Sequence, residues 1–105
     1  MEDALARARR LGYLDDAAFA RVVATRRSQT HGPAVIAAEL TSKGVGRDLV
    51  REALGEVSRE HLVAAARRLA GRAGGADPRR VAGRPLRRGF SSDVVREALD
   101  GDVDP

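Results

Sequence analysis

The chain has 105 residues, a net charge of +4 and no cysteine. This length allows one compact domain or two small joined units, and the lack of cysteine excludes disulfides and thiolate chemistry. No stretch approaches the ~20 apolar residues that span a bilayer, and no apolar leader follows the acidic residues 2–3, so we expect a cytoplasmic protein.

The charges are unevenly distributed along the chain. Residues 63–92 contain eight arginines and one acid, Asp77, whereas residues 97–105 contain four acids and no base. A basic segment followed by an acidic one indicates a polyanionic or acidic partner. A solvated helix surface is the alternative interpretation.

The first third of the chain predicts two helices. Apolar residues recur every third position over 2–11, which predicts a helix that ends at Gly12. Asp15 is a favoured N-cap residue, so a second helix is predicted to start there and to run to about Gln29.

A motif then recurs with an offset of 45 residues: 44–54 (GVGRDLVREAL) returns as 89–99 (GFSSDVVREAL). Each copy indicates the end of one helix and the start of the next. Gly44 and Gly89 suit the left-handed position after a helix, and Ser91 is a favoured N-cap. A repeat of this length indicates a supersecondary unit that is used more than once.

The repeat extends back to Pro33 and Pro78, each of which suits the first turn of a helix. The sequence therefore predicts an all-α, elongated fold of two tandem three-helix repeats after a leading helix. The predicted boundaries are 1–12 for the leading helix, 13–57 and 58–100 for the repeats, and 101–105 for an acidic, disordered tail.

Pro85 departs from the repeat, because Leu40 stands at the equivalent position of the first unit. A proline inside a helix removes a backbone hydrogen bond and costs about 3 kcal/mol or more. We therefore expect a kink or an early end of that helix, and a less stable second repeat.

Few residues favour catalysis or metal binding. Asp15 and Asp16 could form a carboxylate pair, but a cap followed by a first-turn acid is the favoured interpretation. His31 and His61 lack the spacing of a helical zinc motif, so surface or capping roles are expected. The glycine-rich residues 71–75 lack the lysine of a phosphate-binding loop, which favours a linker. We predict no enzymatic activity, no cofactor and no metal.

The basic side chains are the best candidates for binding, since guanidinium groups bind carboxylates and phosphates. The candidate residues for a protein partner or nucleic acid are Arg26, Arg27, Lys43, Arg67, Arg68, Arg72, Arg79, Arg80, Arg84, Arg87 and Arg88. The two helix–turn–helix steps are also typical of DNA readers. However, acids on the second helix of each step would repel phosphates, which favours a packing role. These acids are Asp48, Glu52, Asp93 and Glu97.

Several motifs, in their order and spacing, resemble the RecX regulatory protein family. They are Gly12-Tyr13-Leu14-Asp15-Asp16, Phe19-Ala20, Gly32, Ile36, Glu39-Leu40, Lys43-Gly44-Val45, Arg88-Gly89-Phe90 and Val95 to Leu99. Members of that family consist of tandem three-helix repeats, usually three. With two repeats and a leading helix, the resemblance implies a member that is truncated at its N-terminus.

The resemblance implies a non-enzymatic regulator in DNA repair and the SOS response, which binds the RecA recombinase filament and usually inhibits it. We expect a monomeric body that lies in the filament groove without membrane contact, where its arginines meet acidic protein surface or DNA. A stand-alone basic helical DNA-binding module is the alternative, and a remnant without activity is a third interpretation.

Overall fold

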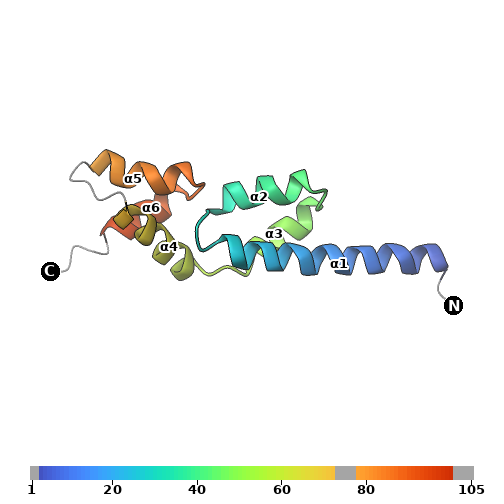
Figure 1. The fold of residues 1–105 in the computed structure, drawn as a ribbon. Helices are drawn as coiled ribbons and strands as arrows, with labels where there is room; N and C mark the ends of the chain where they lie inside the picture. Colours follow the sequence, from blue (N-terminus) through green and yellow to red (C-terminus); the bar gives the residue numbers. More distant parts are fainter. Residues whose placement is uncertain (1–2, 73–77, 101–105) are drawn as a thin grey trace.

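The computed structural model describes residues 3–72 and 78–100, which form six helices and no strand (Figure 1). The helices are α1 (Ala4–Arg27), α2 (Pro33–Ser42), α3 (Arg47–Gly55), α4 (Arg59–Arg72), α5 (Pro78–Arg87) and α6 (Ser92–Asp100). Within these residues, α1, α2 and α3 contact one another, as do α4, α5 and α6, and no helix of one group contacts a helix of the other. The predicted all-α fold of three-helix units is confirmed.

The offset of the sequence repeat is also the offset of the helices. α2 and α5 begin and end 45 residues apart, and so do α3 and α6. α4 corresponds to residues 14–27, the last fourteen residues of α1, and both helices end at an arginine, Arg27 or Arg72. One repeat of sequence is therefore one repeat of structure.

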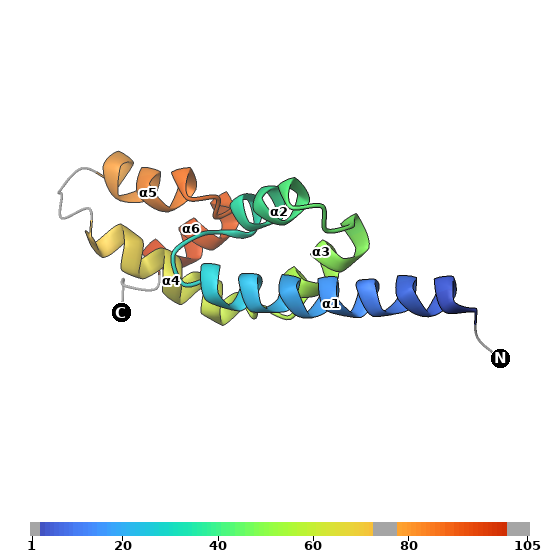
Figure 2. The same cartoon turned by 45° about the vertical axis from the view of Figure 1, so that its right-hand side comes forward.

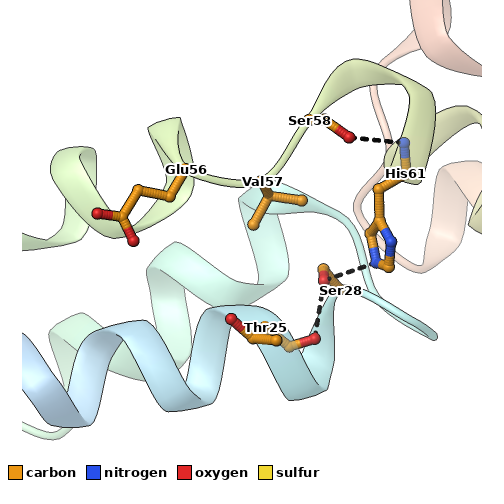
Figure 3. Close-up of a pocket in the computed structure, with 6 residues that line it drawn as sticks. All are labelled: Thr25, Ser28, Glu56, Val57, Ser58 and His61. Carbon is orange, nitrogen blue, oxygen red and sulfur yellow. Dashed lines mark hydrogen bonds between the residues drawn. The ribbon is translucent and has the colours of Figure 1, made fainter.

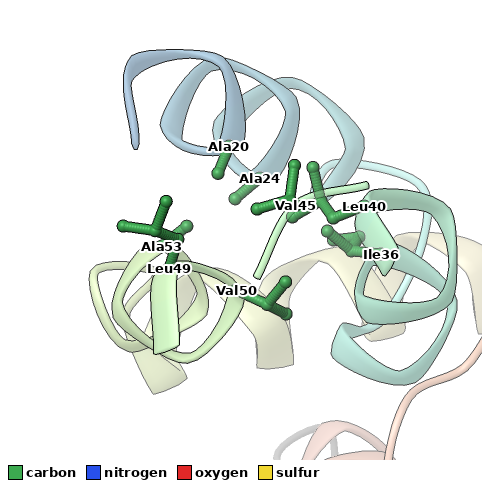
Figure 4. Close-up of a cluster of buried hydrophobic side chains, with 8 residues drawn as sticks. All are labelled: Ala20, Ala24, Ile36, Leu40, Val45, Leu49, Val50 and Ala53. Carbon is green, nitrogen blue, oxygen red and sulfur yellow. The ribbon is translucent and has the colours of Figure 1, made fainter. Parts of the chain in front are cut away.

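Each unit has its own hydrophobic core. The first core consists of Ala20, Ala24, Ile36, Leu40, Val45, Leu49, Val50 and Ala53 (Figure 4). The second consists of Val63, Ala65, Ala66, Leu69, Phe90, Val94, Val95 and Ala98. Ala20 and Ala65, 45 residues apart, are both fully buried, because a methyl group lets α1 and α4 approach the other two helices of their unit closely.

α1 is one continuous helix, so the prediction of two helices that are separated at Gly12 is wrong. The helix begins at Ala4, after the N-cap Asp3, whose carboxylate accepts a hydrogen bond from the amide of Leu5 at 3.3 Å. Asp15 lies inside α1 and is not a cap. Glycine in a helix costs about 1 kcal/mol, which is less than the backbone hydrogen bonds that a break would remove.

The predicted leading helix is therefore the first half of α1. Residues 3–16 are all exposed, and this half of the helix projects beyond the first unit (Figure 2). The limits 13–57 and 58–100 of the two repeats stay predictions, and the predicted tail 101–105 lies outside the described residues. Gly71 and Arg72 belong to α4, whereas residues 73–75 of the predicted linker lie outside the described residues.

The two predicted turns are confirmed. Among the described residues, Gly44 (φ +87°) and Gly89 (φ +95°) alone have positive φ. The amide of Val45 donates to the carbonyl of Leu40 at 3.0 Å, which closes the Schellman motif that typically ends a helix at a left-handed glycine. At the start of α6, the hydroxyl of Ser91 accepts from the Val94 amide at 3.3 Å, as expected of an N-cap.

Gly44→Ala is expected to lower the free energy of unfolding by about 1 kcal/mol, because a residue with a Cβ is strained in the left-handed region. Gly55→Ala is the matched control, since a Cβ has open space at both sites and Gly55 has no positive φ. There we expect a gain of up to about 1 kcal/mol. Urea unfolding followed by circular dichroism measures both, and equal changes would contradict the assignment.

α5 continues through Pro85 to Arg87, so the predicted early end of this helix is wrong. Pro85 is less than 2% exposed, and its carbonyl accepts from the Phe90 amide at 3.1 Å. Leu40 has the same burial and the same bond in the first unit. Pro85 therefore takes over the role of Leu40. The predicted kink and the lower stability of the second unit stay predictions.

The two units form an elongated body of 64 × 26 × 17 Å. Its radius of gyration is 17.2 Å, whereas a compact domain of this length has about 13 Å. α5 and α2 lie end to end along the body, and the second half of α1 runs beside α2 and α3 (Figures 1 and 2). The predicted elongated shape is confirmed.

Candidate partner interface

The eleven candidate basic residues lie in three parts of the structure. Arg26 and Arg27 are at the end of α1, and Lys43 directly follows α2. The others belong to α4, α5 and the turn after α5. The backbone of Arg80 belongs to α5, but its side chain lies outside the described part of the chain.

Two candidates of the first unit make contacts within that unit. Arg27 Nη2 lies 2.9 Å from Glu39 Oε1, which joins α1 to α2. The ammonium group of Lys43 lies 5.6 Å from the ring centroid of Phe19, a cation–π contact between the end of α2 and α1. These two charges already have partners, which makes them weaker candidates for an external partner.

Two candidates of α4 donate to backbone carbonyls. Arg67 Nε lies 3.0 Å from the oxygen of Ala98 in α6. Arg68 Nη2 lies 3.2 Å from the oxygen of Gln29, just beyond α1. Arg68 therefore connects the two units, and its guanidinium group lies at the end of α1.

A shallow hollow on α1 lies beside this contact. It has a volume of about 460 Å³ and is lined by Arg21, Val22, Thr25, Arg26 and Gln29. Because Arg68 reaches Gln29, the structure brings Arg26 and Arg68 to one region of the surface. Arg21 also lines the hollow, although its guanidinium group pairs with Glu56 at 3.1 Å.

α5 carries the most basic outer face of the second unit. Arg79 and Arg87 are exposed, Arg84 is half-buried, and Leu86 is 44% exposed. The helix contains no acid. Arg87 lies against Gly83, where an added Cβ would be 3.0 Å from its Nη1 atom, so the glycine makes room for the guanidinium group. This face combines positive charge with a small apolar surface.

The two units meet where the end of α5 faces the start of α2. The amide of Gly32 donates to the carbonyl of Arg88 at 2.7 Å, and the amide of Ala34 faces the carbonyl of Gly89 at 3.4 Å. The negative end of one helix dipole thus meets the positive end of the other. Both sets of terminal backbone groups find partners, which fixes the direction of one unit relative to the other.

His31 lies at this junction. Its Nε2 atom is 3.2 Å from Nη1 of Arg88, and its Nδ1 atom is 2.8 Å from the hydroxyl of Thr30. A guanidinium group can only donate, so Nε2 accepts and the ring is neutral. Burial lowers the pKa of His31, as do the charges of Arg88 and Arg27, whereas Glu39 acts in the opposite direction.

His61 makes another polar contact between the units (Figure 3). Its Nε2 atom lies 3.0 Å from the hydroxyl of Ser28, which is 1% exposed and donates to the carbonyl of Thr25 at 3.0 Å. Because the hydroxyl proton is used in that bond, the imidazole donates to Ser28. A nucleophile and its general base would need the reverse direction, so this pair is structural.

Both histidines are thus half-buried and connect the two units, which corrects the expectation of surface or capping roles. The contacts join residues 57 and 33 positions apart, so no local pattern could reveal them.

We also searched the described residues for a metal site and for a membrane-spanning helix. Those residues contain no group of three or more His, Cys, Asp or Glu that could hold a metal ion. None of the described helices is both long enough and apolar enough to cross a membrane.

The tandem units with separate cores define a helical-repeat protein with basic outer surfaces. Residues 15–54 match the family described as RecX, second three-helix domain. This segment covers the last part of α1, all of α2 and most of α3. The first unit therefore contains the second three-helix domain of the RecX family.

Curated relatives agree with this assignment. The chain is 40% identical over 67 residues to proteins named Regulatory protein RecX from two strains of Thermus thermophilus, across 64% of this chain and 47% of each relative. A protein of the same name from Lactobacillus delbrueckii is 41% identical over 61 residues, or 22% of its length. The chain thus spans about half the length of the Thermus relatives. No solved structure matches it.

Proposed function

We propose that the protein binds the RecA recombinase filament and inhibits its recombination and DNA-dependent ATPase activities. The family assignment supports this, because the relatives are named regulatory proteins. The protein acts in the cytoplasm as a monomer, and DNA contributes to the surface that it contacts. Because the chain spans 47% of the Thermus relatives, the proposal concerns the activity of these two units.

The acid-free outer face of α5 is the observation that carries the proposal. Arg79 and Arg87 are exposed there, and guanidinium groups bind both carboxylates and phosphates in a forked geometry. Arg26, Arg68 and Arg72 add positive charge at the end of α1 and on α4. These surfaces would attract the acidic protein surface or the DNA phosphates of a nucleoprotein filament.

The mechanism is steric and electrostatic. A body 64 Å long and 17 Å thick can lie along a groove, where it would obstruct strand exchange and filament growth. The backbone bonds between the turn after α5 and the start of α2 hold both units in one line, so that both can touch the filament together. Two linked contacts raise the total affinity without any new kind of contact.

A titration of RecA on single-stranded DNA tests the proposal. ATP hydrolysis is expected to fall as the protein is added, and unchanged hydrolysis at saturating protein would refute inhibition. The double variant Arg79→Glu, Arg87→Glu should bind at least about 10-fold more weakly, a change of about 1.4 kcal/mol. The matched control is Arg47→Glu, Arg51→Glu, which reverses two exposed arginines of α3. If both variants lose affinity equally, the α5 face is not the contact.

The alternative, a stand-alone DNA-binding module, predicts a different response to salt. Binding to phosphates alone should weaken with a log–log slope of about −0.9 for each duplex phosphate that is neutralised, or about −0.7 on single strands. The exposed acids of α3 and α6 argue against this alternative, because Asp48, Glu52 and Asp93 would repel a phosphate backbone. Tight binding to naked DNA that disappears with this slope would favour it.

A further inference from the structure

The junction between the two units lies where the turn after α5 meets the start of α2. No helix of one unit packs against a helix of the other, so each contact between the units includes a residue of a turn. On one side lie His31 and Gly32, just before α2, and on the other side lie Arg88 and Gly89, just after α5. The side-chain bond between His31 and Arg88 is directly next to the backbone bond from Gly32 to Arg88.

The charges around His31 come from three elements. Arg88 follows α5, Arg27 belongs to α1, and Glu39 belongs to α2. Glu39 is already bonded to Arg27 at 2.9 Å, so its charge is largely compensated. A positive charge on the protonated ring would therefore face two guanidinium groups and one neutralised carboxylate.

Protonation would also remove the bond itself. Nε2 of the neutral ring accepts from Arg88, but in the imidazolium ion both nitrogens carry hydrogen and neither can accept. The 3.2 Å contact would then join two donors of the same charge. Such a pair is repulsive. The repulsion would also strain the backbone bond from the amide of Gly32 to the carbonyl of Arg88.

We propose that His31 is a proton-operated latch, which holds the two three-helix units in line when neutral and releases Arg88 when protonated. The direction of the pH dependence follows from the structure. Because the latched state disfavours the proton, the junction is intact above the ordinary pKa of histidine, about 6.5, and weakens as the pH falls below it. The latch belongs to the free chain and does not depend on the partner proposed above.

His61 provides an internal control. It also joins the two units, but its Nε2 atom donates to Ser28, so a proton on Nδ1 would leave that bond in place. Only one of the two histidines should therefore make the junction sensitive to pH.

Distance measurements between spin labels test the latch in the whole chain. The chain has no cysteine, so Ala38→Cys in α2 and Arg96→Cys in α6 give one label in each unit, both at exposed sites. We expect one narrow distance population at pH 7.5 and a second, longer one at pH 5. His31→Gln, whose amide can still accept from Arg88, should keep the narrow population at both values, whereas His61→Gln should respond like the unsubstituted protein.

Arg88→Met should show the second population even at pH 7.5, because it removes the donor of the latch. Identical distances at pH 7.5 and pH 5, a full response in His31→Gln, or a narrow population in Arg88→Met would each overturn the proposal. Circular dichroism is recorded on the same samples. A loss of helix at pH 5 would also overturn it, since the units would then unfold instead of separating.

Discussion

Gly32→Ala is expected to lower the free energy of unfolding by about 3 kcal/mol. A Cβ at this position would overlap the backbone of Gly89 and Phe90, which cannot turn away as a flexible side chain could. The two units would have to move apart. The amides of Gly32 and Ala34 would then lose the carbonyls of Arg88 and Gly89. The effect is steric, because φ of −86° and ψ of 172° at Gly32 are open to alanine.

Gly46→Ala is the matched control for this substitution. Gly46 precedes α3 as Gly32 precedes α2, and its backbone is also extended, with φ of −67° and ψ of 154°. No atom lies within 4 Å of an added Cβ. The expected loss is therefore about 0.5 kcal/mol, the difference between glycine and alanine at an N-cap. Urea unfolding by linear extrapolation measures both variants, and similar losses would show that the junction tolerates a Cβ.

Leu40→Ala and Pro85→Ala are expected to differ strongly although the two residues occupy equivalent positions. Leu40 is fully buried, so its truncation should cost about 3 kcal/mol. Pro85→Ala loses roughly two methylene groups, or about 1.6 kcal/mol, and frees the unfolded chain. In return, the alanine has an amide hydrogen that can bond to the carbonyl of Val81. The net change should lie within about 1 kcal/mol of zero.

Thermal and urea unfolding of both variants check this difference. Because each unit has its own core, Leu40→Ala should weaken mainly α1 to α3, which hydrogen exchange of individual amides can locate. A loss of about 3 kcal/mol in Pro85→Ala would show that the ring fits α5 without strain. In that case the predicted lower stability of the second unit would have no basis in Pro85.

The repeated motif made most of the fold predictable. Each turn combines a left-handed glycine, an N-cap and a hydrophobic residue at a fixed spacing, and these local rules act together at Gly44 and at Gly89. Their agreement fixed the ends of α2 and α5 and the starts of α3 and α6. The offset of 45 residues then required the two units to have the same architecture.

Local rules failed where a single residue opposed a longer pattern. Gly12 and Asp15 resemble a stop and a cap, but the hydrogen bonds of a continuous α1 outweigh both. Pro85 lies so near the end of α5 that only the bond to the carbonyl of Val81 is lost, while its ring fills a core position.

The sequence was enough to predict which arginines form the candidate surface. It was not enough to predict which of them bond within the chain. Composition alone indicates that α4 and α5 are basic. Which guanidinium groups bond within the chain depends on residues that are distant in sequence, such as Ala98 for Arg67 and His31 for Arg88. Arg88 consequently belongs to the junction.

The closeness of Gly32 to the turn after α5 has a consequence for engineered arrays. Adding a third unit with the same stacking would place a new turn against the start of α5. The residue 45 positions after Gly32 is Asp77, and every residue except glycine carries the Cβ that the stacking excludes. A designer who wishes to lengthen the array would therefore replace Asp77 with glycine, and leaving the aspartate in place would limit concatenation.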